Sequence, residues 1–279
     1  MSTIPDTTPA EVGLEKELGT VNLGNGSSND MPAASPIVPG GKSTTTTSSF
    51  AASLREWQTT PLKVPIVDPA EGALPLARAE LTPEQQSKYE ALLDTVKSWT
   101  EIPSTMGKGG PIREDEKMWL TKECLLRYLR ATKWSTTDAP KRLLGTLTWR
   151  REYGVWDLTG DHVSPENETG KQFLLGYDIS GRPCHYLNPG RQNTEPSPRQ
   201  VQHLVFMVER AINLMIVDQE TLALLINFKS SKSRTNTAPG IGQGREVLNI
   251  LQIHYPERLG RALIINSKTD CHDSQLRIN

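Results

Sequence analysis

A stretch near the end of the sequence decides the fold: His254-Tyr255-Pro256-Glu257-Arg258-Leu259-Gly260-Arg261-Ala262-Leu263-Ile264-Ile265-Asn266. Pro256 cannot continue a helix and Gly260 suits a sharp turn, so the stretch predicts a helix end followed by a turn. The apolar run at residues 263–265 is typical of a strand that is covered on both faces. Glu257 and Arg258 then lie where a helix end meets a sheet edge, either as a satisfied ion pair or as part of a ligand site.

The segments before this stretch alternate between strand and helix patterns. Strand-like runs at 173–177 and 183–187 predict a hairpin, because Asp178-Ile179-Ser180-Gly181 between them is a turn sequence. A helix from Pro198, a buried strand over 221–228, a helix over about 242–254 and the last strand follow. This order predicts an α/β fold with a mainly parallel sheet flanked by helices.

Three helices are expected before the sheet. Thr82-Pro83-Glu84-Gln85 is a capping-box start with proline at the first helical position. A second helix is expected from about Glu114 to Thr132. A third is expected to begin near Thr137 or Asp138 and to end near Gly154. The apolar residues of these segments recur at helical spacing.

The composition separates a polar tail from the rest. Residues 1–79 are rich in Thr, Ser, Pro and Gly, and they lack a periodic apolar pattern. Such a segment cannot bury enough surface to offset the entropy lost on ordering, so it is expected to be disordered. The expected organisation is a tail at 1–79, a helical region at 80–155 and a sheet-containing region at 156–279.

Charge and cysteine content indicate a cytoplasmic protein. The formal net charge of −1 gives no support for non-specific nucleic-acid binding. Cys124, Cys184 and Cys271 are odd in number and far apart, as expected of reduced thiols. No apolar run approaches the roughly 18 residues of a membrane-spanning helix, and the N-terminus lacks an apolar signal region.

No pattern for catalysis or metal binding is found. The Gly-x-Ser-x-Gly nucleophile motif is absent, and the histidines show no obvious triad order. The pairs Cys184-His185 and Cys271-His272 lack the Cys-x-x-Cys spacing of zinc sites. We therefore expect a protein that is not an enzyme and that holds no metal or cofactor.

Four motifs, in the right order, resemble the CRAL-TRIO lipid-binding family. They are Cys124-Leu125-Leu126-Arg127-Tyr128-Leu129-Arg130-Ala131-Thr132-Lys133-Trp134, Trp149-Arg150-Arg151-Glu152-Tyr153-Gly154, the hairpin residues Asp178, Gly181, Arg182 and Pro183, and Tyr255-Pro256-Glu257-Arg258-Leu259-Gly260. The resemblance is to the fungal phosphatidylinositol-transfer proteins of this family. Within them, the stretch Tyr186-Leu187-Asn188-Pro189-Gly190-Arg191-Gln192-Asn193-Thr194 is similar to the branch linked to azole resistance. It implies a helical tripod followed by the CRAL-TRIO fold.

The resemblance implies phosphatidylinositol binding and transfer between membranes, with transient contact with membrane surfaces. An apolar pocket holds acyl chains tightly, since each buried CH₂ is worth roughly 0.8 kcal/mol. The anionic headgroup needs cations and hydrogen-bond donors beside it. Carried over, its contacts are Thr132, Lys133 and Glu257, with Thr132 standing where the best-known member has arginine. The alternatives are an exposed surface lysine at Lys133 and a structural ion pair at Glu257, with Arg258 or a tripod cation.

The resemblance also bears on a second ligand. Members that carry phosphatidylcholine use tyrosines around the hairpin, whereas the corresponding positions here are Leu174 and His185. The choline site is therefore expected to be lost. A sterol or another apolar lipid is expected as the second ligand instead.

The end of the sequence departs from the family pattern. Family domains continue after the last strand with an apolar gating helix, whereas residues 267–279 are polar. We expect a C-terminally truncated chain whose last strand lacks its cover and exposes an apolar patch on the order of several hundred Å². The alternative functions are a non-transferring regulatory or scaffold protein, or an inactive truncated product.

Overall fold

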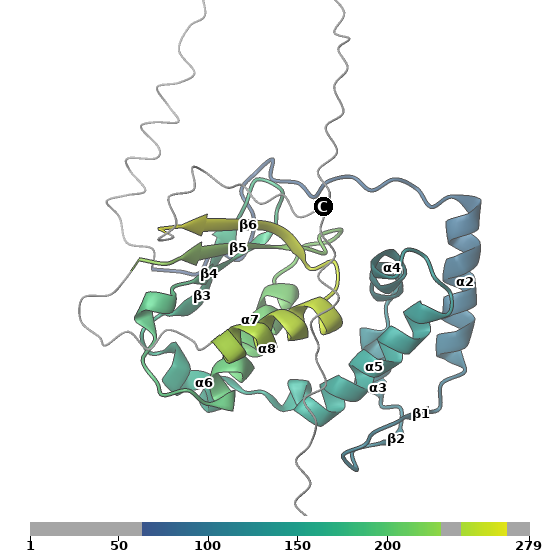
Figure 1. Cartoon of the computed structure of the whole chain (residues 1–279). Coiled ribbons are helices and arrows are strands. Elements are labelled where there is room, and N and C mark those ends of the chain that lie inside the picture. The colour runs from purple at the N-terminus through teal and green to yellow at the C-terminus, as the bar shows by residue number, and fades with distance from the viewer. Residues whose placement is uncertain (1–62, 230–240, 267–279) are drawn as a thin grey trace, which may run out of the picture. The chain divides into compact units, whose positions relative to one another are not determined.

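The computed structural model describes residues 63–229 and 241–266, and Figure 1 shows their elements in order. The helical region contains α2 (Pro83–Lys97), α3 (Glu114–Trp119), α4 (Lys122–Ala131) and α5 (Asp138–Tyr153). At the start of α2, the Thr82 hydroxyl accepts a hydrogen bond from the Gln85 backbone N–H at 3.2 Å. The Gln85 side chain accepts one from the Thr82 N–H at 3.1 Å. The predicted capping-box start is confirmed.

The second predicted helix is in fact two helices. The expected span from about Glu114 to Thr132 is interrupted at Leu120, whose φ of −79° and ψ of 52° are not helical. Thr121 then caps α4, because its hydroxyl accepts a hydrogen bond from the Cys124 N–H at 3.2 Å. The prediction of one helix is wrong because this threonine satisfies a free N–H of a new helix start.

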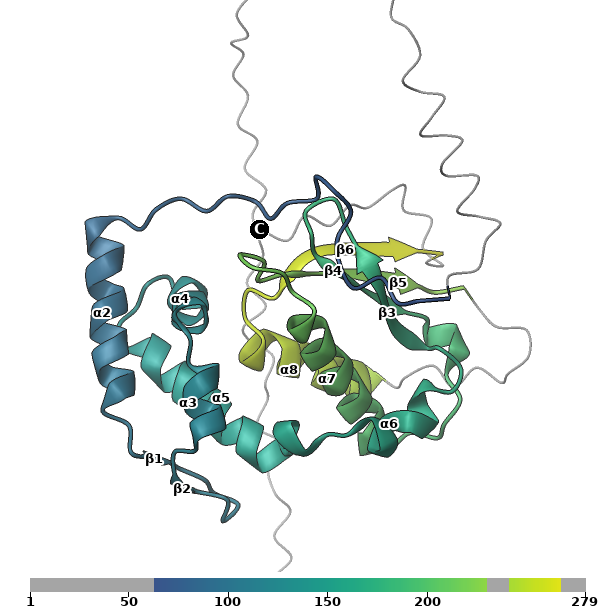
Figure 2. The ribbon, with the colours of Figure 1, turned by 180° about the vertical axis from the view of Figure 1, so that it is seen from behind.

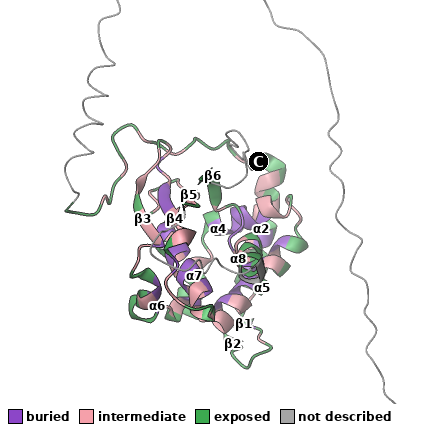
Figure 3. Ribbon diagram, turned by 60° about the vertical axis from the view of Figure 1, so that its left-hand side comes forward, coloured by how far each residue is buried: buried purple, intermediate pink, exposed green. Residues whose placement is uncertain are grey.

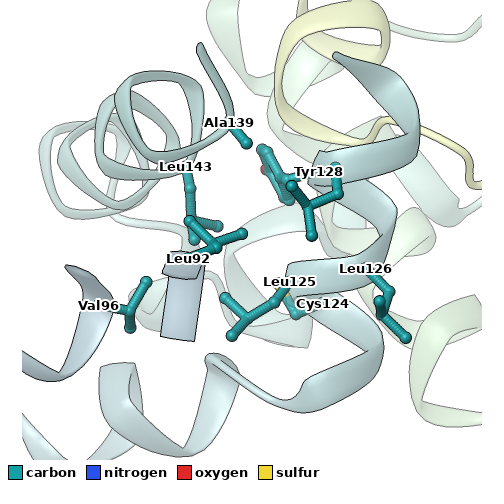
Figure 4. Packing of buried hydrophobic residues seen from close by; sticks show 9 residues of the cluster. Leu92, Val96, Cys124, Leu125, Leu126, Tyr128, Ala139 and Leu143 are labelled. Atoms are coloured by element: carbon teal, nitrogen blue, oxygen red, sulfur yellow. The ribbon is translucent and has the colours of Figure 1, made fainter. Parts of the chain in front are cut away.

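Helices α2, α4 and α5 pack around one apolar core, shown in Figure 4. Its buried members are Leu92, Val96, Cys124, Leu125, Leu126, Tyr128, Leu129, Ala139 and Leu143. In α2 and α5 these residues lie on one face of the helix, whereas in α4 every residue from Cys124 to Leu129 is buried. Helix α5 ends at Gly154, whose φ of 75° lies in the left-handed region that favours glycine.

The four-stranded sheet has the order β3-β4-β5-β6. Strands β3 (Gln172–Tyr177) and β4 (Pro183–Leu187) form the predicted antiparallel hairpin. Strand β5 (Leu222–Asn227) is parallel to β4, and β6 (Leu259–Ile265) is parallel to β5. The predicted α/β class with a mainly parallel sheet is confirmed.

Two long helices cover one face of this sheet. Helix α7 (Pro198–Asn213) connects β4 to β5, and α8 (Ile241–His254) precedes β6. Figures 1 and 2 show both helices on the same side of the sheet. Side chains from these elements form a second apolar core that includes Val205, Leu222, Ile250 and Tyr255.

Several short elements were not predicted from the sequence. They are β1 (Glu101–Ile102), β2 (Gly110–Pro111), η1 (Val155–Asp157), α6 (Gly160–Asn167) and η2 (Pro189–Arg191). Thr159 caps α6 by accepting a hydrogen bond from the His162 N–H at 3.3 Å. The sequence of α6 is mostly polar, so no apolar periodicity indicated a helix there.

The start of β6 differs from its prediction. The strand begins at Leu259, so Gly260 lies within it rather than in a turn. The left-handed residue after α8 is Glu257, with a φ of 59°. Gly260 is needed because a Cβ there would lie 2.5 Å from both Arg182 Nε and Thr221 Oγ1.

Strand β6 is also not buried on both faces. Leu263 and Ile264 are each 38% exposed and Ile265 is 55% exposed, and Figure 3 shows the strand in green. The prediction of a covered strand is wrong within the described residues, because β6 is an edge strand that pairs with β5 alone. The exposure of its apolar side chains agrees with the expectation for an uncovered strand, while residues 267–279 lie outside the described part.

Residues 63–78, which the sequence analysis assigns to the tail, contact the sheet region. The Tyr177 hydroxyl donates to the Val67 carbonyl oxygen at 2.7 Å. Arg78 forms an ion pair with the buried carboxylate of Glu220. Residues 1–62, which make up most of the predicted disordered tail, lie outside the described residues.

Candidate functional site

The predicted site residues follow two helix ends that one side chain joins. Thr132 and Lys133 follow α4, and Glu257 follows α8. Arg142, on α5, donates hydrogen bonds to carbonyl oxygens in the last residue of α4 and in the last turn of α8, both at 3.4 Å. A cation is favourable there because the last carbonyl groups of a helix carry partial negative charge. The fold thus brings together the two segments that carry the predicted residues.

The end of α8 is fixed by aromatic and polar contacts as well. The Tyr128 hydroxyl donates to the His254 carbonyl oxygen at 3.3 Å, and Thr146 Oγ1 lies 3.2 Å from His254 Nδ1. The Trp149 ring stacks on the His254 ring, with centroids 4.0 Å apart and planes inclined by 5°. Burial, together with the charge of Arg142, lowers the pKa of His254 to about 4, so the ring is neutral at pH 7.

Tyr255 anchors the Tyr-Pro-Glu-Arg element to the core. Its hydroxyl donates to Glu209 Oε1 at 2.7 Å, and Arg150 donates to both oxygens of Glu209 at 2.8 and 3.1 Å. Burial raises the pKa of Tyr255, so the phenol keeps its proton. Burial alone would raise the pKa of Glu209, but the hydrogen bonds from Arg150 and Tyr255 lower it. A charged carboxylate therefore holds both partners.

Arg258 is the second anchor of the element. Its guanidinium donates to the Glu220 carbonyl oxygen at 2.9 Å. Burial and the neighbouring charge of Arg127 lower the pKa of Arg258 to about 10. The Glu220 carboxylate in turn accepts from Arg130 at 2.5 Å and pairs with Arg78. This cluster ties α4, the segment before α2 and the start of β6 together.

Glu257 lies between these two anchors but is itself exposed. Its φ of 59° is left-handed, a conformation that costs a residue with a Cβ roughly 1–2 kcal/mol. Within the described ranges, its carboxylate has neither a hydrogen bond nor an ion pair. The alternative in which Glu257 pairs with Arg258 or a tripod cation therefore finds no support in these contacts.

Lys133 shares both properties with Glu257. It is exposed, its φ is 51°, and the next residue, Trp134, also has a positive φ of 63°. Its ammonium group has no carboxylate partner in the part of the chain that the structure describes. Thr132 differs, because its hydroxyl donates back to its own helix, with the Tyr128 carbonyl oxygen at 2.9 Å. Two of the three predicted residues thus present free charges.

An apolar cavity of about 190 Å³ lies between α7, α8 and the hairpin strands. Its apolar wall is made by Leu187, Pro189, Val201, Leu204 and Val247, and its polar wall by Lys171, Gln172, Asn188, Gln192 and Gln200. Val247 and the end of α8 are seven residues apart (254 minus 247), which is about 10 Å along a helix. One helix therefore connects the cavity wall to the segment of Glu257.

Sequence reasoning missed the side chains that position the site. Arg142 and Glu220 belong to no motif, and their partners are distant in sequence. Glu209 had a detectable signal, because it lies directly beside the apolar face of α7, next to Val208. A carboxylate at such a position is buried only when it is paired.

Two kinds of feature are absent from residues 63–229 and 241–266. No group of three or more His, Cys, Asp or Glu side chains is placed to hold a metal ion. No helix there has both the length and the apolar character required to cross a membrane.

A helical region followed by this α/β domain is the arrangement of one known class. The CRAL/TRIO domain model matches residues 167–269, and the model of the CRAL/TRIO N-terminal domain matches residues 88–145. The chain therefore belongs to the CRAL-TRIO family.

Curated relatives agree with this assignment. A CRAL-TRIO domain-containing protein of Schizosaccharomyces pombe is 58% identical over 188 residues, which cover 67% of this chain and 18% of that protein. Phosphatidylinositol transfer protein PDR17 of Saccharomyces cerevisiae is 43% identical over 205 residues, covering 67% of this chain and 59% of that protein. The chain thus spans less than two thirds of each. The crystal structure of Sfh5 is 16% identical, with a TM-score of 0.46 over 69% of this chain and 74% of that chain.

Proposed function

We propose that the protein binds phosphatidylinositol and carries it between membranes without catalysing a reaction. A relative that is 43% identical is named a phosphatidylinositol transfer protein, which supports this ligand. The observation that carries the proposal is the pair of exposed, unpartnered charges, Lys133 and Glu257, at two helix ends that Arg142 joins. A lipid carrier needs such groups for the polar end of its cargo.

The two charges suit the two parts of an inositol phosphate headgroup. The ammonium group of Lys133 is a compact cation for the phosphate. The carboxylate of Glu257 is a strong acceptor for the inositol hydroxyl groups. Thr132 has a smaller role in this proposal, because its hydroxyl proton is already used by its own helix.

The cavity beside α8 supports an additional apolar ligand. Its apolar wall favours hydrocarbon, and the amide oxygens of Gln192 and Gln200, whose nitrogens already donate to Thr194, can accept from one hydroxyl group. A sterol combines these two features, and we propose a sterol or a similar apolar lipid as the second ligand.

Phosphatidylcholine is not part of the proposal. Leu174 and His185 lie directly opposite each other in the hairpin, so their side chains project from the same face. Quaternary ammonium groups are recognised by the faces of aromatic rings such as tyrosine. His185 is instead buried, and its Nε2 lies 3.2 Å from Gln172 Oε1. Leu174 and His185 therefore do not supply the aromatic ring faces that bind a choline group.

The proposed location is the cytoplasm, with transient contact with membrane surfaces. Cys124 and Cys184 are buried free thiols, which suits a reducing compartment. Cys271 lies outside the described residues.

The test combines lipid identification with a transfer assay. Lipids that co-purify with the full chain are identified by mass spectrometry, and transfer of labelled phosphatidylinositol between vesicles is followed in parallel. Loss of one charge-assisted hydrogen bond is worth roughly 1.5–3 kcal/mol, so Glu257→Ala should reduce loading at least about tenfold. Glu246→Ala, which removes an exposed carboxylate from α8 itself, is the matched control and should load normally. Absence of phosphatidylinositol above a blank, or equal loss in both variants, would refute the proposal.

A further inference from the structure

Three apolar side chains protrude at the end of the sheet where β4, β5 and β6 begin. Ile179 lies in the hairpin turn, Val217 lies in the turn between α7 and β5, and Val67 lies in the extended segment before α2. They are 80%, 85% and 61% exposed, respectively. We call these three residues the apolar tip. Single exposed apolar residues are ordinary on protein surfaces, so the question is whether these are gathered.

Polar contacts hold the three segments of the apolar tip together. The Tyr177 hydroxyl lies 2.7 Å from the Val67 carbonyl oxygen and 3.1 Å from a carbonyl oxygen at the end of α7. The Gln219 side-chain amide donates to the Ser180 carbonyl oxygen in the hairpin turn at 2.7 Å. The hairpin turn, the turn after α7 and the extended segment are therefore fixed beside one another.

The hairpin turn that carries Ile179 has several of its polar groups paired internally. The Asp178 carboxylate accepts from the N–H groups of Ser180 and Arg182 at 2.8 and 3.0 Å, and it pairs with the Arg182 guanidinium at 3.0 Å. The Gly181 N–H donates to the Asp178 carbonyl oxygen at 2.9 Å. Each backbone N–H or C=O group that is moved out of water without a hydrogen-bond partner costs several kcal/mol. These internal bonds lower the cost of moving the turn out of bulk water.

We propose that the apolar tip inserts into the headgroup region of a neutral phospholipid bilayer. The inference rests on the proposed function, since a lipid carrier has to dock on membranes. Two of the three side chains stand on turns and point outward, which suits a soft surface that closes around them. The exposed carboxylates of Asp68 and Asp218 directly follow Val67 and Val217, so anionic lipids are repelled. The occupant is therefore a zwitterionic membrane surface.

The test measures binding of the full chain to vesicles of pure phosphatidylcholine by flotation. The double variant Ile179→Ser, Val217→Ser should bind at least about tenfold more weakly, because each CH₂ removed from lipid is worth roughly 0.8 kcal/mol. Met118→Ser is the matched control: Met118 is 76% exposed on α3, and its loss should leave vesicle binding unchanged. Replacing a third of the lipid with phosphatidylserine should weaken binding by the unmodified protein.

The outcomes separate this inference from the proposed function. Equal binding by the double variant and the unmodified protein overturns it, as does stronger binding to the anionic vesicles. The inference is also overturned if the double variant binds vesicles normally but no longer self-associates, because the apolar tip then contacts a second copy of the chain. If the unmodified protein carries no phosphatidylinositol yet loses vesicle binding in the variant, the proposed function fails while the docking surface stands.

Discussion

Replacing Glu209 with glutamine removes the negative charge on which Arg150 and Tyr255 converge. Arg150 donates to both carboxylate oxygens, at 2.8 and 3.1 Å, and the Tyr255 hydroxyl donates at 2.7 Å. Arg150 is only 2% exposed, so water cannot replace the lost partner. The substitution keeps the size of the side chain, and its effect therefore reports the charge rather than the packing.

The expected loss of stability is large. Removing one partner of a buried ion pair costs about 3–5 kcal/mol, because the other charge stays buried without compensation. Because glutamine retains one acceptor oxygen, we expect Glu209→Gln to lower the free energy of unfolding by about 3 kcal/mol, the low end of this range. This corresponds to an equilibrium constant of unfolding that rises on the order of a hundredfold.

Urea unfolding at pH 7, followed by tryptophan fluorescence, measures this effect. Glu114→Gln is the control, because the pair of Glu114 and Lys117 is exposed at both ends and should contribute less than about 0.5 kcal/mol. A loss below about 1 kcal/mol for Glu209→Gln, or equal losses in the two variants, would show that the buried pair does not stabilise the anchor of Tyr255.

The same carboxylate predicts a dependence on pH. The pKa of Glu209 is lowered in the folded protein, so its stabilisation is fully present above the unfolded value of about 4.3. It is lost as the pH falls through the folded pKa. The free energies of unfolding of the unmodified protein and of Glu209→Gln should therefore converge in acid. A constant difference from pH 7 to pH 3 would refute the assignment to charge.

Three further substitutions test other parts of the structure. Glu257→Gly should raise the free energy of unfolding by about 1 kcal/mol in urea melts while lowering phosphatidylinositol loading, because glycine adopts a left-handed φ without strain; a less stable variant would contradict this. Gly260→Ala should cost about 1–3 kcal/mol in thermal melts, since its Cβ would lie 2.5 Å from Arg182 and Thr221; an unchanged midpoint would show that the neighbours yield. Burial lowers the pKa of His203 to about 4. The neutral ring therefore contributes fully to the free energy of unfolding above pH of about 6.5, and this contribution declines toward pH 4. His203→Leu should flatten this decline in pH-dependent melts, and an unchanged slope would exclude the imidazole as its source.

Features set by short-range chemistry could be predicted from the sequence. The capping box at Thr82 and the hairpin turn ending in Gly181 depend on residues within a few positions of one another. The alternation of apolar strands and helices then indicates a parallel sheet without further information. For the same reason, the helix stop at Pro256 was located correctly, although the left-handed residue beside it is Glu257.

Features set by distant partners could not be predicted in the same way. Arg142 joins two helix ends that are more than a hundred residues apart along the chain, and no local pattern marks it. The break before Thr121 was missed because the apolar periodicity continues across it. The exposure of Ile265 depends on what lies beside an edge strand, which the strand's own sequence does not record.

The strain at Glu257 and Lys133 bears on how the proposed site works. Left-handed conformations of residues with a Cβ persist only where the surrounding structure over-determines them. At Glu257 the cause is visible, because Tyr255 and Arg258 on either side are both held in the interior. The direction in which the Glu257 side chain leaves the backbone is thus set by the fold before any ligand arrives. A ligand that uses it loses less binding energy to ordering the site, which is the advantage of preorganisation. Exposed charges on regular helix faces would lack this preorganisation. This difference is the physical reason for proposing that the headgroup binds at Lys133 and Glu257.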